Sequence, residues 1–254
     1  MTLAYDGTEF HGWAKQPGVR TIEGALGEAI GRVLREVPVL SVAGRTDAGV
    51  HAEGQVASFA CPGAVDVDRV QRAANAMLAP EIVVRRAAVA PESFDARHSA
   101  RARLYRYRLD TESVASPFTA RFVWHRPGDL DLGAMRRAAA RLVGEHDFAS
   151  FCRAPKPPAV TTRDLRELTV SARGRQIVVT AQADSFLHQM VRSLVGTLVA
   201  VGEGKLDAQS MSEILAARDR GAAGPIAPPQ GLSLVRVFYG SSPRLTSSRS
   251  IRRK

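Results

Sequence analysis

Cysteine and long apolar runs are both scarce in this chain of 254 residues. The two cysteines, Cys61 and Cys152, lie far apart, which excludes a disulfide framework or a cysteine-rich metal site and fits a reducing compartment. No apolar run reaches the roughly 18 residues of a membrane span. The first residues also lack the basic and apolar regions of a signal peptide. We therefore expect a cytoplasmic protein without a membrane anchor.

Sequence motifs for cofactors and metals are missing as well. Gly202-Glu203-Gly204-Lys205 lacks the glycine spacing of a phosphate-binding loop. His51-Ala52-Glu53 matches only one half of a zinc deaminase signature, because the Pro-Cys-x-x-Cys half is absent. If the chain is an enzyme, we expect its side chains to carry the chemistry with no cofactor and no metal.

Positive charge is abundant. The chain has 35 Lys and Arg against 25 Asp and Glu, a net charge of +10 and a pI near 10.5. A balance this basic indicates a polyanionic partner, nucleic acid above all. Charge alone leaves open a basic protein that is merely soluble.

The residue pattern predicts an α+β fold with helices on one side of a mainly antiparallel sheet. Thr21 is a good N-cap for an amphipathic helix over 22–37. A hairpin is expected around Gly174, between strands over 165–172 and 176–183. The strand expected over 101–109 has arginines on both faces, which is unusual for a core strand and typical of one that faces a polyanion.

A glycine-flanked loop with an Arg-Thr-Asp triplet lies between strands expected over 38–42 and 55–60. Gly44 and Gly49 would let the backbone approach a ligand closely. Arg45 and Asp47 would present a guanidinium and a carboxylate on this loop. Thr-Asp-Ala-Gly is also an ordinary turn sequence, so a purely structural loop stays open.

Arg192 is the one formal charge in an apolar helix expected over 186–201. A helix that is apolar nearly all round is buried, and a buried guanidinium needs an anionic partner. We expect Arg192 to meet a carboxylate or a phosphate, with His188 one turn earlier on the same helix face. A structural ion pair is the alternative.

Tyr105 lies among the arginines of the strand expected over 101–109. A strand tyrosine is usually a core residue. Between several arginines it would also suit stacking on a base beside backbone phosphates.

Two segments resemble a known family. Gly44-Arg45-Thr46-Asp47-Ala48-Gly49-Val50-His51 is similar, without interruption, to the signature of the tRNA pseudouridine synthase A family. The segment from Ala183 to Gly196, with Phe186-Leu187 and Met190-Val191-Arg192, resembles its second signature. The resemblance extends over about residues 1–239. Ala14 departs from the family, which usually has glutamine there.

The resemblance implies roles for four residues. Asp47 would be the catalytic residue, either as a nucleophile at C1′ or as a base at C2′. Arg192 would be its ion-pair partner, holding it ionised and oriented. Tyr105 would pack on the target uracil. Arg45 would occupy the space of the flipped nucleotide or grip its phosphate.

The resemblance also implies a function and an organisation. The expected reaction is isomerisation of uridine to pseudouridine at positions 38, 39 and 40 of the tRNA anticodon stem-loop, by a homodimer. The expected halves are 1–104, with the Asp47 loop, and 105–240, with the Arg192 helix, around an active-site cleft. Residues 241–254 would be a basic, disordered tail. The alternatives are a catalytically silent RNA-binding protein and a hydrolase with an aspartyl nucleophile.

Overall fold

The computed structural model describes residues 1–61, 63–153 and 160–240. The tail expected at 241–254 lies outside these residues. Within them, no helix combines the length and the apolar character needed to cross a bilayer.

The described residues contain ten strands and five α-helices, besides four short 3₁₀ helices. The strands are β1 (Thr2–Tyr5), β2 (Ser41–Val42), β3 (His51–Ser58), β4 (Ile82–Arg86), β5 (Ala102–Asp110), β6 (Trp124–His125), β7 (Gly144–Asp147), β8 (Thr162–Arg173), β9 (Gln176–Ala183) and β10 (Leu232–Phe238). The α-helices are α1 (Ile22–Leu34), α2 (Val67–Leu78), α3 (Leu132–Leu142), α4 (Met190–Gly202) and α5 (Met211–Ala217).

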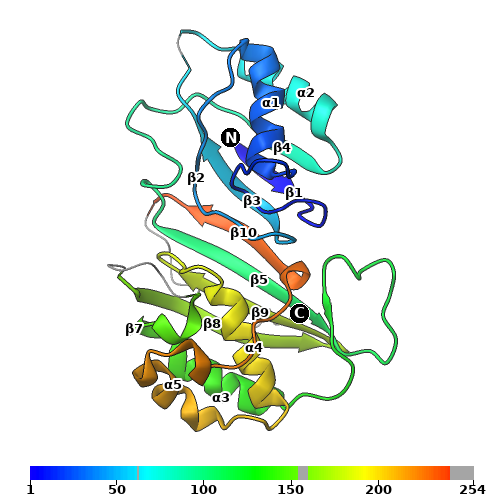
Figure 1. The fold of residues 1–254 in the computed structure, drawn as a ribbon, viewed down its shortest axis with the longest axis vertical. Helices are drawn as coiled ribbons and strands as arrows, with labels where there is room; N and C mark the ends of the chain where they lie inside the picture. The colour runs from blue at the N-terminus through cyan, green and yellow to red at the C-terminus, as the bar shows by residue number, and fades with distance from the viewer. Residues whose placement is uncertain (62, 154–159, 241–254) are drawn as a thin grey trace, which may run out of the picture.

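The strands form one sheet in the order β4-β1-β3-β10-β5-β9-β8-β7, with β2 paired to β3 and β6 to β5. The β10–β3 and β5–β6 pairs are parallel and the others are antiparallel. The predicted α+β class with a mainly antiparallel sheet is therefore confirmed. In Figure 1, α1 and α2 accompany β1 to β4, whereas α3, α4 and α5 accompany β7 to β9.

β5 and β10 lie at the centre of the sheet and join its two ends (Figure 1). β10 is the last strand of the described chain, yet it pairs with β3 on one side and β5 on the other. The division expected between residues 104 and 105 stays a prediction, and β5 runs across that position.

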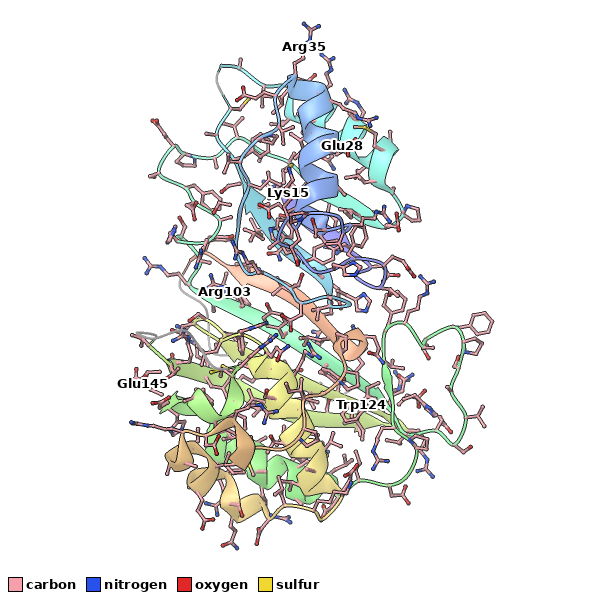
Figure 2. The ribbon with its side chains drawn as sticks, viewed as in Figure 1. Lys15, Glu28, Arg35, Arg103, Trp124 and Glu145 are labelled. Carbon is pink, nitrogen blue, oxygen red and sulfur yellow. The ribbon has the colours of Figure 1, made fainter. Side chains whose placement is uncertain are left out.

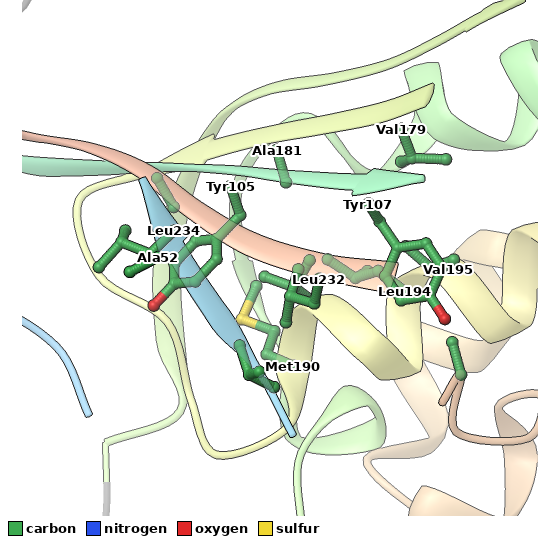
Figure 3. Close-up of a cluster of buried hydrophobic side chains, with 14 of the residues drawn as sticks. Ala52, Tyr105, Tyr107, Val179, Ala181, Met190, Leu194, Val195, Leu232 and Leu234 are labelled. Atoms are coloured by element: carbon green, nitrogen blue, oxygen red, sulfur yellow. The ribbon is translucent and has the colours of Figure 1, made fainter. Parts of the chain in front are cut away.

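One face of this centre is covered by α4. Tyr105 lies opposite Leu234 on β10 and Ala181 on β9, so these side chains share a face. Figure 3 shows Tyr105 and Tyr107 on that face together with Met190 and neighbouring apolar residues of α4. These side chains belong to one continuous apolar core.

The expectation that the arginines of β5 face a polyanion stays a prediction, but two of them have partners within the protein. β5 is a central strand in which six of nine residues are buried. Arg103 donates to the carbonyl oxygen of Ala43 at 2.7 Å, and Arg108 pairs with Glu53 at 2.9 Å. The protein itself supplies acceptors for these guanidinium groups, which allows them to lie on an interior strand.

Two predicted helices differ from the structure at one end. α1 begins after Thr21, whose Oγ1 accepts from Gly24 N as expected, but it ends at Leu34 because Arg35 takes a left-handed conformation at φ 60°. α4 begins at Met190 instead of residue 186, because Gln189 is left-handed at φ 62°. His188 therefore lies outside the helix that carries Arg192.

Candidate active site

The Asp47 loop, defined as Ala43 to Val50, is held by the backbone of an N-terminal segment. Trp13 N donates to Thr46 O at 2.9 Å, and Gly49 N donates to Phe10 O at 3.3 Å. Gly12 has φ +85°, and a Cβ there would lie 2.7 Å from Thr46 O. Only glycine allows this approach without displacing a neighbour, so residues 10–13 fix the position of the loop.

Buried polar side chains support the loop from β1 and β3. The Tyr5 hydroxyl shares a hydrogen bond of 2.9 Å with Thr46 Oγ1. Gln55 Nε2 donates to Gly44 O at 2.7 Å and to the Tyr5 hydroxyl at 3.2 Å. Burial raises the pKa of Tyr5 to about 12, against smaller lowering effects of Thr46 and Gln55. These contacts fix the backbone on both sides of Arg45.

Asp47 meets Arg192, the contact that the family resemblance implied. Arg192 Nη1 lies 2.9 Å from Asp47 Oδ2, with the two side chains 14% and 24% exposed. Arg192 Nε also donates to Ala227 O at 2.8 Å. Because both ends of the guanidinium are bonded, its orientation toward the carboxylate is fixed.

The segment that carries Ala227 reaches Arg192 by crossing α4 at a glycine. A Cβ on Gly196 would lie 1.7 Å from Pro225 O. Ala227 N donates back to Arg192 O at 3.1 Å. Gly196 therefore leaves room for the backbone of the 225–227 segment.

A second nitrogen partner of Asp47 was not predicted. His188 Nε2 lies 3.4 Å from Asp47 Oδ1, and the His188 side chain is 54% exposed. The sequence placed His188 one turn before Arg192 on the same helix face. The two residues do meet at one carboxylate, although His188 precedes the helix. The position of His188, four residues before Arg192, was the one sign in the sequence that the two side chains could meet.

Tyr105 lies against the loop from the sheet. A Cβ on Gly44 would lie 3.6 Å from the Tyr105 hydroxyl oxygen. The residue is 7% exposed, and its ring packs edge-on against Phe186, with ring centroids 5.1 Å apart. Burial, followed by the nearby Tyr5, raises the pKa of Tyr105 well above its ordinary value. Its phenol therefore keeps its proton at neutral pH.

Arg45 lies two residues before Asp47 on the same loop. Its side chain belongs to an exposed residue between the buried Ala43 and Thr46. Exposure beside Asp47 leaves its guanidinium available to a ligand.

Arg103 connects the loop to the segment that follows β9. Its Nε and Nη2 donate to Ala43 O at 3.1 and 2.7 Å, and its Nη1 donates to Asp184 O at 2.6 Å. Figure 2 shows Arg103 at the middle of the molecule, near the start of β5. No residue pattern predicted this role, because the backbone carbonyls that accept from Arg103 are distant in the chain and can belong to any residue type.

Among the described side chains, no group of three or more His, Cys, Asp or Glu gathers closely enough to hold a metal ion. The reactive groups that converge at the loop are thus a carboxylate, a guanidinium, an imidazole and a phenol. Such a set can orient a carboxylate for nucleophilic attack or proton abstraction.

Comparison with known proteins identifies the family. The family model described as tRNA pseudouridine synthase matches residues 1–99 and 138–240. A tRNA pseudouridine synthase A of Methylobacterium nodulans is 44% identical over 241 residues, 94% of each chain. Proteins of the same name from Frankia casuarinae and Moorella thermoacetica are 45% and 43% identical, covering 100% and 94% of this chain and 93% and 98% of their own. The chain belongs to the tRNA pseudouridine synthase family.

The two segments matched by the family model contain Asp47 and Arg192 respectively. The contact between these residues thus joins the two matched parts of a tRNA pseudouridine synthase family member. Tyr105 lies between the matched segments, on the central strand. The catalytic roles of Asp47 and Arg192, and the substrate-binding roles of Tyr105 and Arg45, stay predictions.

Proposed function

We propose that this chain isomerises uridine to pseudouridine at positions 38, 39 and 40 of the tRNA anticodon stem-loop. Membership of the tRNA pseudouridine synthase family supports the reaction. The observation that carries the assignment of the site is the 2.9 Å contact between Asp47 and Arg192, because it joins the two segments of the chain that the family model matches.

Asp47 acts on the ribose in this proposal. The bond between N1 and C1′ breaks, the uracil turns, and C5 joins C1′ while C5 loses its hydrogen and N1 gains one. Asp47 either attacks C1′ as a nucleophile or takes a proton from C2′. Arg192 serves both routes, because a guanidinium fixed at Ala227 O and at Oδ2 holds the carboxylate in one orientation.

Tyr105 and Arg45 act on the base and its backbone. Tyr105, which is 7% exposed, contacts the uracil as a neutral phenol and not as a tyrosinate base. Arg45, exposed beside Asp47, grips the phosphate of the flipped nucleotide or fills its place in the stem. Removing a base from a paired stem costs a few kcal/mol, which binding must supply.

The net charge of +10 supplies much of that binding. Phosphate neutralisation releases counterions, so affinity for tRNA should fall steeply with salt. The proposal includes a homodimer in the cytoplasm, with one tRNA reaching across both subunits. Sedimentation with and without tRNA tests the homodimer.

Tritium release from tRNA labelled at uridine C5 tests the function. Wild-type protein is expected to release tritium, and Asp47→Ala to release none while still binding tRNA. Transcripts with cytidine at positions 38, 39 and 40 should release no tritium. Binding without release by the wild type would contradict the isomerase and favour a silent RNA-binding protein. Tritium release by Asp47→Ala would show that the reaction does not require Asp47.

A further inference from the structure

His188 and Arg192 contact different oxygens of the same carboxylate. Arg192 Nη1 lies 2.9 Å from Oδ2 of Asp47, and His188 Nε2 lies 3.4 Å from Oδ1. The second distance is longer than that of a typical N–H···O hydrogen bond. Hydrogen bonds at active sites are often long without substrate and tighten in the complex. Each oxygen of Asp47 therefore has its own nitrogen partner within reach.

The two partners are held in different ways. Arg192 is 14% exposed and bonded at Nε to Ala227 O, so it has little freedom. The His188 side chain is 54% exposed, while its carbonyl oxygen accepts from Arg153 N at 3.1 Å. The next residue, Gln189, has the left-handed φ of 62° that starts α4 abruptly. The backbone of His188 is thus fixed, and its half-exposed ring can adjust.

One bonded oxygen does not fix a carboxylate. The torsion that turns the Asp carboxylate about Cβ–Cγ is broad, so a single bond at Oδ2 leaves the plane of the group poorly defined. A second donor at Oδ1 defines that plane. Alignment of the reacting group contributes strongly to rate, and a small misplacement is costly.

We propose that His188 is a positioning residue for Asp47. Its Nε2–H donates to Oδ1 and, together with Arg192 at Oδ2, fixes the plane of the carboxylate toward the reacting uridine. This inference rests on the proposed function. It assigns His188 an effect on the rate of the chemical step and none on the affinity for tRNA.

Two amide variants of different length separate this role from a structural one. The amide nitrogen of His188→Gln can reach the position of Nε2, whereas that of His188→Asn is too short. In single-turnover tritium release with saturating tRNA, His188→Asn should be slower by roughly ten- to a hundred-fold, with an unchanged dissociation constant. His188→Gln should recover most of the rate. Equal rates for wild type and His188→Asn, equal losses in both variants, or a loss confined to affinity would each overturn the proposal.

A measurement without turnover gives an independent test. In protein labelled with ¹⁵N-histidine, the His188 ring signals should shift in Asp47→Ala and stay in place in Tyr105→Phe. If the His188 ring signals keep their positions in Asp47→Ala, the proposal is overturned. If the wild type releases no tritium, the proposed function fails, but the shift still reports whether His188 bonds to Asp47.

Discussion

Asp47 and Arg192 meet in space, but different forces hold the segments that carry them. The Asp47 loop is fixed by directional hydrogen bonds, among them Trp13 N to Thr46 O at 2.9 Å and Arg103 Nη2 to Ala43 O at 2.7 Å. In α4, by contrast, every residue except Arg192 is buried against the core. The carboxylate lies on a hydrogen-bonded loop and the guanidinium on a hydrophobically packed helix.

The difference determines how each segment responds to change. The position of a packed helix depends on many small contacts, so volume-conserving substitutions are tolerated. The position of the loop depends on a few directional hydrogen bonds. Substitutions at single contacts should therefore disturb the loop more than the helix, unless they remove the group through which the two segments meet.

Arg192→Met removes that group and should have the largest effect. Methionine suits an apolar helix, so α4 should keep its packing. Asp47 loses its partner at 2.9 Å, and Ala227 O loses its donor. We expect single-turnover tritium release to slow by roughly a hundred- to a thousand-fold, as for other lost charge-stabilising donors. Urea unfolding should show that the free energy of unfolding is lower by about 2 kcal/mol.

Arg192→Lys is the matched control. Lysine keeps the charge but cannot bond to Asp47 and Ala227 in the fixed geometry of a guanidinium. Its rate should lie between those of wild type and Arg192→Met. A lysine variant no faster than the methionine variant would mean that geometry, and not charge, decides the rate. A fully active methionine variant would contradict the role of Arg192 altogether.

The sequence predicted the packed segment better than the hydrogen-bonded one. Apolar residues all round α4 predicted its burial and the need of Arg192 for an anionic partner, and that contact is confirmed. Hydrophobic periodicity reports burial directly. It did not reveal the left-handed Gln189, which starts the helix four residues later than expected.

The loop was recognised by a motif, but its support was not. The bonds from Trp13 and Arg103 end on backbone carbonyls, and no residue type marks those acceptors in a sequence. The preceding strand was also predicted too long: only Ser41–Val42 pairs, and Val39 is exposed. Nothing in the sequence analysis predicted β7, a short strand at the end of the sheet.

Gly12→Ala tests the hydrogen-bonded loop without changing any reactive group. The new Cβ would lie 2.7 Å from Thr46 O and 3.1 Å from Ala48 N, at a φ of +85° that disfavours alanine. The backbone around Asp47 must shift. We expect a loss of about 2 kcal/mol in urea unfolding and a slower single-turnover rate.

Gly18→Ala separates backbone strain from close approach. Gly18 has a similar φ of +73°, but nothing lies within 4 Å of its added Cβ. This variant should lose about 1 kcal/mol of unfolding free energy and keep the wild-type single-turnover rate. If both variants lose the same stability and neither loses rate, the approach of Gly12 to the Asp47 loop does not position the carboxylate.

Tyr5→Phe should have the smallest effect, and one that depends on pH. At pH 8 the variant should lose about 1 kcal/mol of unfolding free energy, because Thr46 Oγ1 and Gln55 Nε2 lose a partner.

The pH dependence follows from ionisation of Tyr5. Its pKa is raised from 10.0 to about 12, so above pH 10 the unfolded chain ionises first and wild-type stability falls. That fall is about 1.4 kcal/mol per pH unit for this group, and phenylalanine removes it. The difference between wild type and variant should therefore shrink toward zero near pH 11, although the other tyrosines still titrate in both proteins. Urea unfolding at pH 8, 10 and 11 measures it. Curves that stay parallel would show that Tyr5 is not the buried phenol that supports the loop through Thr46.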